Sequence, residues 1–265
     1  DVGIIYDLIQ HKHTFIGDPS PCDDNNLYIG KPFVKGVEAG KASKEYIGLF
    51  RIVEENGYQA DAIDIVYSAK NIRNYPLLFL PGSPLIEKKV FKSLIDYVKN
   101  GGTLVITGKL PEIDEEGKNI KFFEIKKKNL LNKKLITDKI NSGRIIFIPE
   151  YIAQDEPEEE NLMNINLVGK ILSKYVGEPE VKIKILETVE WVDWKKEGGG
   201  HKVYKQPRTL GSAILHKSKE ENILFVLNHF PDAVKFELQF KNKKFKKLWN
   251  IETGETIQIK EGKTV

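Results

Sequence analysis

The sequence predicts a doubly wound α/β domain followed by a small antiparallel β domain. Residues 74–108 read as strand, turn, helix, turn, strand, because two short apolar runs flank a helix with one apolar stripe. Two such strands joined by one amphipathic helix form a right-handed βαβ unit. After Pro179 the pattern changes to strict alternation, beginning with residues 181–185. The first pattern is typical of a parallel sheet and the second of a sandwich or barrel.

The first part of the chain alternates strands with helices. Residues 2–6 form the first expected strand, and a long connection over residues 7–41 separates it from a helix that Ser43 can cap. Residues 59–65 form the second strand. The helix between these strands should turn an apolar face inward, made of Tyr46, Leu49, Phe50 and Val53.

The central block contains the third and fourth strands, residues 77–80 and 103–107. Ser83 is expected to cap the helix between them, with Pro84 in its first turn. The glycine pair 101–102 then ends the helix by allowing a left-handed turn. The spacing i, i+3, i+4, i+7 predicts its inward stripe, Phe91, Leu94, Ile95 and Val98.

Residues 109–142 are rich in Lys and weakly periodic, so we expect an inserted excursion with one or two short edge strands. The best strand candidate in it is 121–125. Residues 144–148 form the fifth strand. An acidic cluster, 155–160, then opens a helix that extends from about 161 to 175, where its carboxylates oppose the helix dipole.

The chain is predicted to divide into an α/β domain, residues 1–178, and a β domain, residues 179–265. Short strands separated by turn residues are typical of a small antiparallel sandwich. The strands expected in the β domain are 181–185, 189–194, 210–216, 223–228, 234–240, 246–249 and 256–259.

Composition narrows the classes of function. The formal net charge is only +3 in 265 residues, with Lys and Glu interspersed, which does not favour nucleic acid as a partner. One cysteine excludes a disulfide framework and a Cys/His array for structural zinc. No apolar run approaches the roughly 20 residues that span a bilayer, so no membrane partner is expected. We also expect a cytoplasmic location. Many Lys and Glu with one Cys and one Met are typical of a thermophile.

Ligands of doubly wound sheets bind beyond the carboxyl ends of the strands. Those ends carry Asp7, Ser83, Lys109 and Glu150. A nucleotide or flavin needs a Gly-rich or Ser/Thr-rich cradle after the first strand, and residues 7–11 offer none, so no cofactor is expected. The layout is flavodoxin-like, as in class I glutamine amidotransferases, but the nucleophilic cysteine after the fourth strand is missing.

Two further groups of residues could carry chemistry. His11, His13 and Cys22 could share a metal, but a loop that contacts another subunit is the favoured interpretation. Ser83 could act as a nucleophile only with a histidine beside it, and its capping role is favoured. No catalytic residue is therefore assigned.

Two tryptophans could form contacts outside their own domain. Trp191 and Trp194 are three residues apart on one expected strand, so their side chains point to opposite faces. One should be core, and the other could contact a sugar or a neighbouring domain.

Three segments, taken together, resemble one known family. Residues 3–7, GIIYD, precede a long loop and a helix; residues 77–108 contain a YV-x-x-GG-T-L-V block; residues 223–257 contain N-H and T-G-E elements. Their order is similar to the C-terminal half of family 42 β-galactosidases and related archaeal-type glycosidases. The resemblance implies an amidotransferase-like trimerisation domain and a small β-sandwich, both following a catalytic (β/α)8 barrel.

The catalytic carboxylates of that family lie on the barrel, and no segment here resembles a barrel. The resemblance therefore implies a non-catalytic region for oligomerisation and active-site closure. Its partners would be the parent enzyme's barrel, neighbouring subunits and, through the parent, oligosaccharides. We also expect a piece of a longer polypeptide, because the chain starts directly at a strand without Met and stops within one. Two alternatives are a carbohydrate-recognition module using Trp191 or Trp194 and a stand-alone amidase or hydrolase using Ser83.

Overall fold

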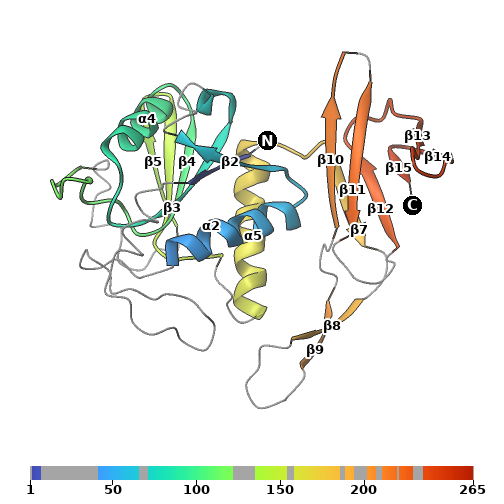
Figure 1. The fold of residues 1–265 in the computed structure, drawn as a ribbon, viewed down its shortest axis with the longest axis horizontal. Coiled ribbons are helices and arrows are strands. Elements are labelled where there is room, and N and C mark those ends of the chain that lie inside the picture. Colours follow the sequence, from blue (N-terminus) through green and yellow to red (C-terminus); the bar gives the residue numbers. More distant parts are fainter. Residues whose placement is uncertain are drawn as a thin grey trace. The chain divides into compact units, whose positions relative to one another are not determined.

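The computed structural model describes residues 2–6, 41–65, 71–121, 135–153, 158–185, 189–193, 202–206, 211–219, 221–228 and 235–264. The chain forms two compact units (Figure 1). Unit 1 contains residues 1–53 and 60–176, and unit 2 contains residues 54–59 and 177–265. Unit 1 is an α/β layer, whereas the strands of unit 2 pair only in antiparallel fashion within the described residues. No described helix is both long and apolar enough to cross a bilayer.

Unit 1 is built on a six-stranded sheet with the order β2-β1-β3-β4-β6-β5. Five strands run parallel, and β5 joins the edge antiparallel to β6. The strands are β1 (Val2–Tyr6), β2 (Ala60–Asp64), β3 (Leu77–Gly82), β4 (Thr103–Gly108), β5 (Ile136–Ile140) and β6 (Gly143–Ile148). Every residue of β3 and β4 is buried, as is typical of strands covered on both faces. The α/β prediction is confirmed.

The two edge strands of this sheet both carry charged residues. In β2 these are Asp61 and Asp64, and in β5 they are Asp138 and Lys139. Asp61 is also anchored, because the Tyr75 hydroxyl donates to its Oδ2 atom over 2.9 Å. The apolar strands therefore lie inside the sheet and the charged ones at its borders.

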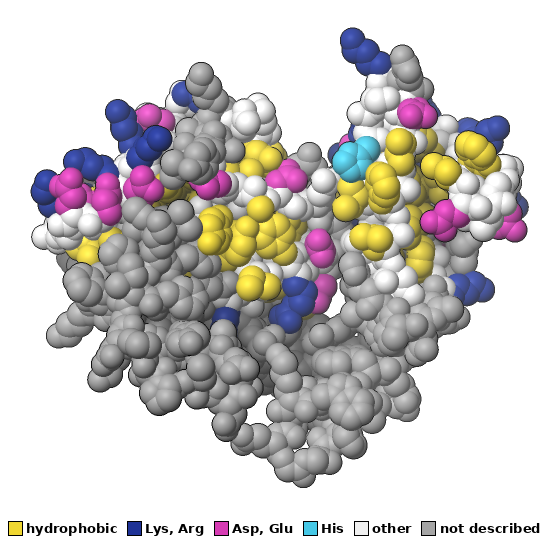
Figure 2. Space-filling model, in the orientation of Figure 1, with side chains coloured by type: hydrophobic (Ala, Val, Ile, Leu, Met, Phe, Trp, Pro, Cys, Tyr) yellow, Lys and Arg dark blue, Asp and Glu magenta, His cyan; other side chains and the backbone are white. Residues whose placement is uncertain are grey.

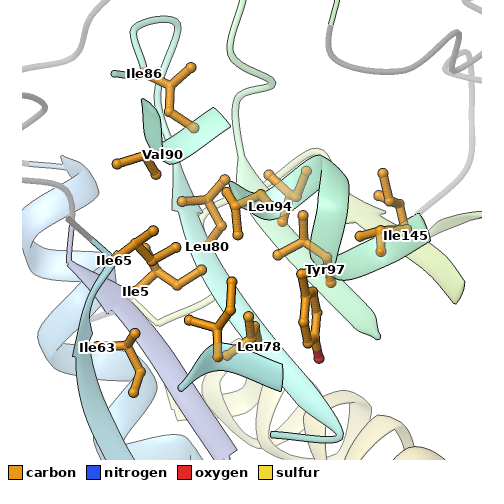
Figure 3. Packing of buried hydrophobic residues seen from close by; sticks show 14 of the residues in the cluster. Ile5, Ile63, Ile65, Leu78, Leu80, Ile86, Val90, Leu94, Tyr97 and Ile145 are labelled. Atoms are coloured by element: carbon orange, nitrogen blue, oxygen red, sulfur yellow. The ribbon is translucent and has the colours of Figure 1, made fainter. Parts of the chain in front are cut away.

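The helices described in unit 1 are α2 (Lys41–Glu55), the short 3-10 helix η1 (Ile72–Asn74), α4 (Lys88–Lys99) and α5 (Glu158–Tyr175). The α4 helix covers one face of the sheet, where Leu94 and Tyr97 pack against Leu78, Leu80 and Ile145 (Figure 3). The alternate strand residues point to the opposite face and are equally buried. Helices α2 and α5 also bury apolar residues, among them Leu49, Ile52 and Val168.

The start of α4 differs from the prediction. Ser83 does not cap the helix, which begins five residues later at Lys88. Instead the Ser83 hydroxyl donates to the Leu85 carbonyl over 3.1 Å and accepts from the Leu85 amide over 3.2 Å. Leu85 in turn pairs with Ile113, which keeps the chain extended past Pro84. A contact between segments distant in sequence therefore overrides the local capping signal.

Residues 109–121 of the predicted excursion pack against this turn. The amides of Glu112 and Ile113 both donate to the Pro84 carbonyl, and Glu115 accepts from the Lys88 amide over 2.7 Å. A carboxylate outside the helix therefore binds its first orphan amide. The best strand candidate, 121–125, lies almost entirely outside the described residues. An edge strand within residues 109–142 is confirmed, because β5 lies there, at residues that the sequence did not single out.

The inward stripe of α4 is also shifted, because it consists of Val90, Leu94, Tyr97 and Val98. Tyr97 is 3% exposed, and its hydroxyl donates to the carbonyls of Tyr75, over 2.9 Å, and Thr103, over 3.3 Å. Its ring lies where a side chain on Gly102 would stand, since a Cβ there would be 2.2 Å from the ring. Gly102 is therefore required for this close approach, while Gly101 provides the left-handed turn with φ of +107°.

The described strands of unit 2 are β7 (Val181–Ile185), β8 (Val189–Asp193), β9 (Lys202–Gln206), β10 (Gly211–Lys217), β11 (Asn222–Asn228), β12 (Phe236–Phe240), β13 (Lys247–Trp249), β14 (Thr256–Gln258) and β15 (Lys263–Thr264). Side chains of β7 and β12 form one core with those of β10 and β11, in a sandwich-like arrangement. The core is centred on Val181, Leu238, Phe240 and Ile259. Seven of these strands match predicted ones, and β9 and β15 were missed.

Tyr97→Phe should destabilise the chain by about 1 kcal/mol in urea unfolding, because two buried carbonyls lose a donor. Ser93→Ala on the exposed side of α4 is the control and should change stability by less than about 0.5 kcal/mol. An equal loss in both variants would contradict the assigned role.

The buried hydroxyl groups of Tyr97 and Tyr75 should make the free energy of unfolding depend on pH. Burial raises the pKa of Tyr97 above the ordinary value of 10. Burial and the hydrogen bond to Asp61 together raise the pKa of Tyr75 to about 12. A raised pKa means that the folded state holds its proton longer, so this stability is present below pH 10 and is lost as pH rises from about 10 towards 12. Tyr97→Phe should lose less stability over this range than the parent chain.

Candidate functional site

The carboxyl ends of the five parallel strands meet at one edge of the sheet, which is where ligands of such sheets bind. Here the chain that leaves β6 turns across the end of β4. The Gly108 amide donates to the Glu150 carbonyl over 2.9 Å, and the Tyr151 hydroxyl donates to the Gly82 carbonyl at the end of β3 over 3.0 Å. Tyr151 therefore ties the ends of β3, β4 and β6 together.

Gly108 is the residue at which an elbow-type nucleophile would stand, directly at the end of the fourth strand. Its φ of +79° is a left-handed conformation that side chains rarely adopt. A Cβ on Gly108 would lie 2.2 Å from the Tyr151 ring. The space that a nucleophilic side chain needs is therefore occupied by an aromatic ring.

The ends of β3 and β4 also lie close to each other. A Cβ on Gly82 would lie 2.0 Å from the Lys109 carbonyl oxygen, so β3 and β4 meet with no space for a side chain between them. Thr107, beside Gly108, is fully buried, and its hydroxyl has no hydrogen-bond partner among the described residues. The described part of this edge is thus packed rather than open.

A buried carboxylate holds the next part of the same loop. Glu45 of α2 is fully buried, and its two oxygens accept from the amides of Ile152, over 2.9 Å, and Ala153, over 2.8 Å. Gly48, one turn further along, allows the contact, because a Cβ there would be 1.8 Å from the Ala153 carbonyl oxygen. Two charge-assisted hydrogen bonds therefore fix this loop to the helix.

Aromatic rings pack between the end of β1 and α2. Tyr6 meets Tyr46 edge-on, with ring centroids 5.3 Å apart, and Tyr46 meets Phe50 in the same way at 5.2 Å. Burial raises the pKa of Tyr46 above 10, and the nearby Tyr6 phenol makes a smaller contribution in the same direction. The Tyr46 phenol therefore stays protonated at neutral pH.

Several residues singled out from the sequence lie outside the described residues: Asp7, His11, His13, Cys22 and Trp194. The metal hypothesis for the loop 7–41 therefore stays a prediction. Within the described ranges, no group of three or more His, Cys, Asp or Glu residues is placed to hold a metal ion. Trp191 lies on β8 opposite Tyr204 of β9.

Ser83 is 3% exposed and shares hydrogen bonds with Leu85 in both directions. Among the described residues the only histidine is His216, which lies on β10 in unit 2. The described residues therefore place no Ser–His pair at this edge.

Sequence reasoning missed the two side chains that organise the edge. Tyr151 follows the fifth strand, and its proximity to Gly108 rests on a contact between segments far apart in the chain. Glu45 is a charged residue in an amphipathic helix, where exposure is the ordinary expectation. The available signal was Gly48 on the same helix, since a glycine inside a helix often marks a close approach.

Unit 2 exposes an apolar face on the ribbon of β10 and β11. Ile223, Phe225 and Leu227 alternate along β11 and are 36%, 51% and 49% exposed. The His216 ring packs edge-on against Phe225, with centroids 5.5 Å apart. Figure 2 shows hydrophobic side chains gathered around this histidine, which is drawn in cyan. The face is contiguous and apolar, which is typical of protein contacts rather than of a catalytic centre.

Comparison with known protein families gives a match over residues 31–150 to a family described as GLMA-like, second domain. A search of curated protein sequences finds no significant relative. The matched residues include β2, β3, β4 and β6, and hence most of the strand ends described above.

Solved structures of glycoside hydrolases share the fold. A catalytic mutant of a GH42 β-galactosidase from G. stearothermophilus has a TM-score of 0.60 and 14% identity, covering 99% of this chain and 39% of its own. A β-galactosidase from Bacillus circulans sp. alkalophilus has a TM-score of 0.58 and 11% identity, covering 99% and 40%. An α-L-fucosidase from Paenibacillus thiaminolyticus has a TM-score of 0.52 and 12% identity, covering 100% and 46%. This chain thus spans less than half the length of each.

Gly108→Ala should destabilise the chain by more than about 2 kcal/mol, because strain at positive φ adds to a clash with Tyr151. Gly117→Ala is the matched control, since its φ is +75° and a Cβ there would meet nothing within 4 Å. Urea unfolding of both variants separates the clash from the strain. Equal losses would show that the Tyr151 ring does not fill the site.

Glu45→Gln should cost about 1.5–3 kcal/mol in the same measurement, because an amide offers one acceptor oxygen where two backbone amides need two. Glu54→Gln, on the same helix but half-buried, should change stability by less than about 0.5 kcal/mol. A neutral result for Glu45→Gln would show that its two hydrogen bonds add nothing to stability.

Proposed function

We propose that this chain is a non-catalytic assembly region of a GH42-type glycoside hydrolase, whose catalytic barrel lies outside it. Its role would be to hold subunits together so that each active site is walled partly by a neighbour. The observation that carries the proposal is the packed carboxyl edge of the sheet, where the Tyr151 ring occupies the place of a nucleophile at Gly108.

The comparisons support the first part of this proposal. The matched GH42 enzymes contain this fold in 39–40% of their length, so most of each enzyme, including its catalytic barrel, lies in the unmatched remainder. An active site on that remainder needs no catalytic group from this fold. The β-galactosidase activity is thus assigned to the parent protein and not to this chain.

The strand order supports an origin from a ligand-binding fold. The five parallel strands follow the order β2-β1-β3-β4-β6, which matches the flavodoxin-like order 2-1-3-4-5. We therefore propose that residues 1–178 form an amidotransferase-like domain with the flavodoxin-like strand order. Residues 179–265 would form a β domain. A cytoplasmic location belongs to the same proposal, since a single cysteine suits a reducing compartment.

Exposed apolar side chains on the helices of unit 1 support self-association. Ile47 of α2 is 69% exposed and Met163 of α5 is 54% exposed. Such side chains on a helix surface are stabilised when a second protein surface covers them. We propose that copies of the chain associate through the outer faces of α2 and α5.

The chain should form a homo-oligomer at micromolar concentration in sedimentation equilibrium and should hydrolyse neither nitrophenyl galactoside nor nitrophenyl glucosaminide. Ile47→Lys should lower the average mass, because a charge on the contact face must be desolvated. Lys44→Glu on the same helix controls for a general effect of charge and should leave the mass unchanged.

Two results would overturn the proposal. One is turnover that a single substitution in this chain abolishes, since a non-catalytic region has no such residue. The other is a monomeric mass at every concentration tested.

A further inference from the structure

Strand β11 forms an open edge of unit 2. On one side it pairs with β10 in an antiparallel register along its whole length. The far side of β10 lies beside β7, whereas no described strand other than β10 pairs with β11. The second side of β11 is therefore a row of main-chain groups that another strand can bind.

The hydrogen bonds of the ribbon show which groups point to that open side. At the turn between β10 and β11 the Ser218 amide donates to the Glu221 carbonyl over 2.9 Å. Opposed residues of an antiparallel pair alternate between hydrogen-bonded and non-hydrogen-bonded pairs. Counting from this bond, the odd-numbered residues of β11 direct their N–H and C=O groups towards β10. The N–H and C=O groups of Leu224 and Val226 therefore point to the open edge.

The open edge of β11 also carries no charge. Its sequence, NILFVLN, contains no charged residue in a chain in which 30% of the residues are charged. By contrast, both edge strands of the sheet in unit 1 contain aspartate. Charge at an edge opposes pairing with a further strand, so an apolar edge that lacks it is available for pairing.

The side chains of β11 are complementary to themselves. Residues at equal distances from Phe225 are alike in type, and the matched residues are Ile223 with Leu227, Leu224 with Val226, and Asn222 with Asn228. A two-fold interface requires a surface that complements itself. An antiparallel partner strand centred on Phe225 would bring each residue opposite its match in a second copy. The strand is therefore suited to pair with itself.

The main-chain geometry agrees with this register. It places Leu224 opposite Val226 of the second copy, and both residues direct their N–H and C=O groups to the open edge, so they can exchange hydrogen bonds. Phe225 then lies opposite Phe225 of the second copy in a non-hydrogen-bonded pair, whose Cα atoms are about 4.5 Å apart. Two aromatic rings at such a position add cross-strand packing.

We propose that β11 of one chain pairs antiparallel with β11 of a second copy, about a two-fold axis at Phe225, so that the two ribbons become one sheet. The exposed side chains Ile223, Phe225 and Leu227 then meet their counterparts on one face of that sheet. Each copy uses the same edge, so the interface is closed and pairing stops at two chains. This contact is separate from the proposed association through α2 and α5.

Disulfide trapping in the full chain tests the register. Cys22→Ser removes the only native thiol, so that each introduced cysteine is the only one in its chain. Phe225→Cys should form a covalent dimer on mild oxidation, because Cα atoms about 4.5 Å apart suit a disulfide. The dimer is read by non-reducing gel electrophoresis.

Ile223→Cys is the matched control, since it lies on the same exposed face of the same strand. In the proposed register two copies of this variant hold their cysteines four residues apart along the strand. That is about 13 Å, beyond the roughly 7 Å that a disulfide can bridge. Ile223→Cys alone should therefore remain monomeric on the gel, whereas its mixture with Leu227→Cys should cross-link.

Charge substitutions test the same contact without a covalent bond. They are made with Ile47→Lys, which removes the proposed association through the helices, and the mass is followed by sedimentation equilibrium. Phe225→Lys and Phe225→Glu should each raise the dissociation constant of the dimer at least about tenfold, because like charges would lie opposite each other. An equimolar mixture of the two should restore the dimer. Trp249→Lys, at another exposed aromatic residue of unit 2, should leave the mass unchanged.

The proposal is overturned if Phe225→Cys cross-links no better than Ile223→Cys, or if the mixture of charge variants associates no better than either alone. Circular dichroism should be the same for all variants, since the substituted side chains are exposed. Trapping reports on β11 alone, so its failure leaves the proposed association through α2 and α5 in place. Conversely, an unchanged mass in Ile47→Lys would count against the helical contact and not against the pairing of β11.

Discussion

The Tyr151 ring and the absent side chain of Gly108 form the contact on which the carboxyl edge of the sheet depends. The ring packs where a Cβ would stand, and its hydroxyl continues to the Gly82 carbonyl on the far side of β4. Because one side chain joins three strand ends, the described part of this edge is closely packed around the ends of β3, β4 and β6. Glu45 extends the same arrangement by binding the next two amides of the loop.

The sheet has the strand order of a ligand-binding fold, but the described part of its carboxyl edge leaves no space for a side chain at Gly108. Folds do not determine activity, which depends on the groups placed at the site. The solved structures that share the present fold are β-galactosidases and an α-L-fucosidase. In each of them the shared fold makes up less than half of the chain.

The sequence predicted those elements that depend on local pattern. The strands β1 and β7 were placed to the residue, because an apolar run and a strict alternation are strong signals. Ser83 was assigned wrongly, because Leu85 pairs with a segment that lies nearly thirty residues further along the chain. Tyr97 was left out of the helix stripe, because its burial depends on hydroxyl partners on two other segments.

The site was predicted less well than the fold. That a nucleophile is missing after the fourth strand follows from the sequence alone, since glycine and lysine stand there. That the Tyr151 ring fills this space could not be predicted, because its contact with Gly108 depends on the conformation of the loop after β6. Glu45 is similar, since its partners lie 107 and 108 residues away and no periodicity connects them.

The charged borders of the sheet have a consequence for how copies of this chain can meet. A bare strand edge invites another chain to extend the sheet by main-chain pairing, and acidic or basic residues at that edge oppose it. Asp64 on one border, and Asp138 with Lys139 on the other, place charge where an incoming strand would align. Growth into a continuous intermolecular sheet, the first step towards fibrils, is thereby disfavoured.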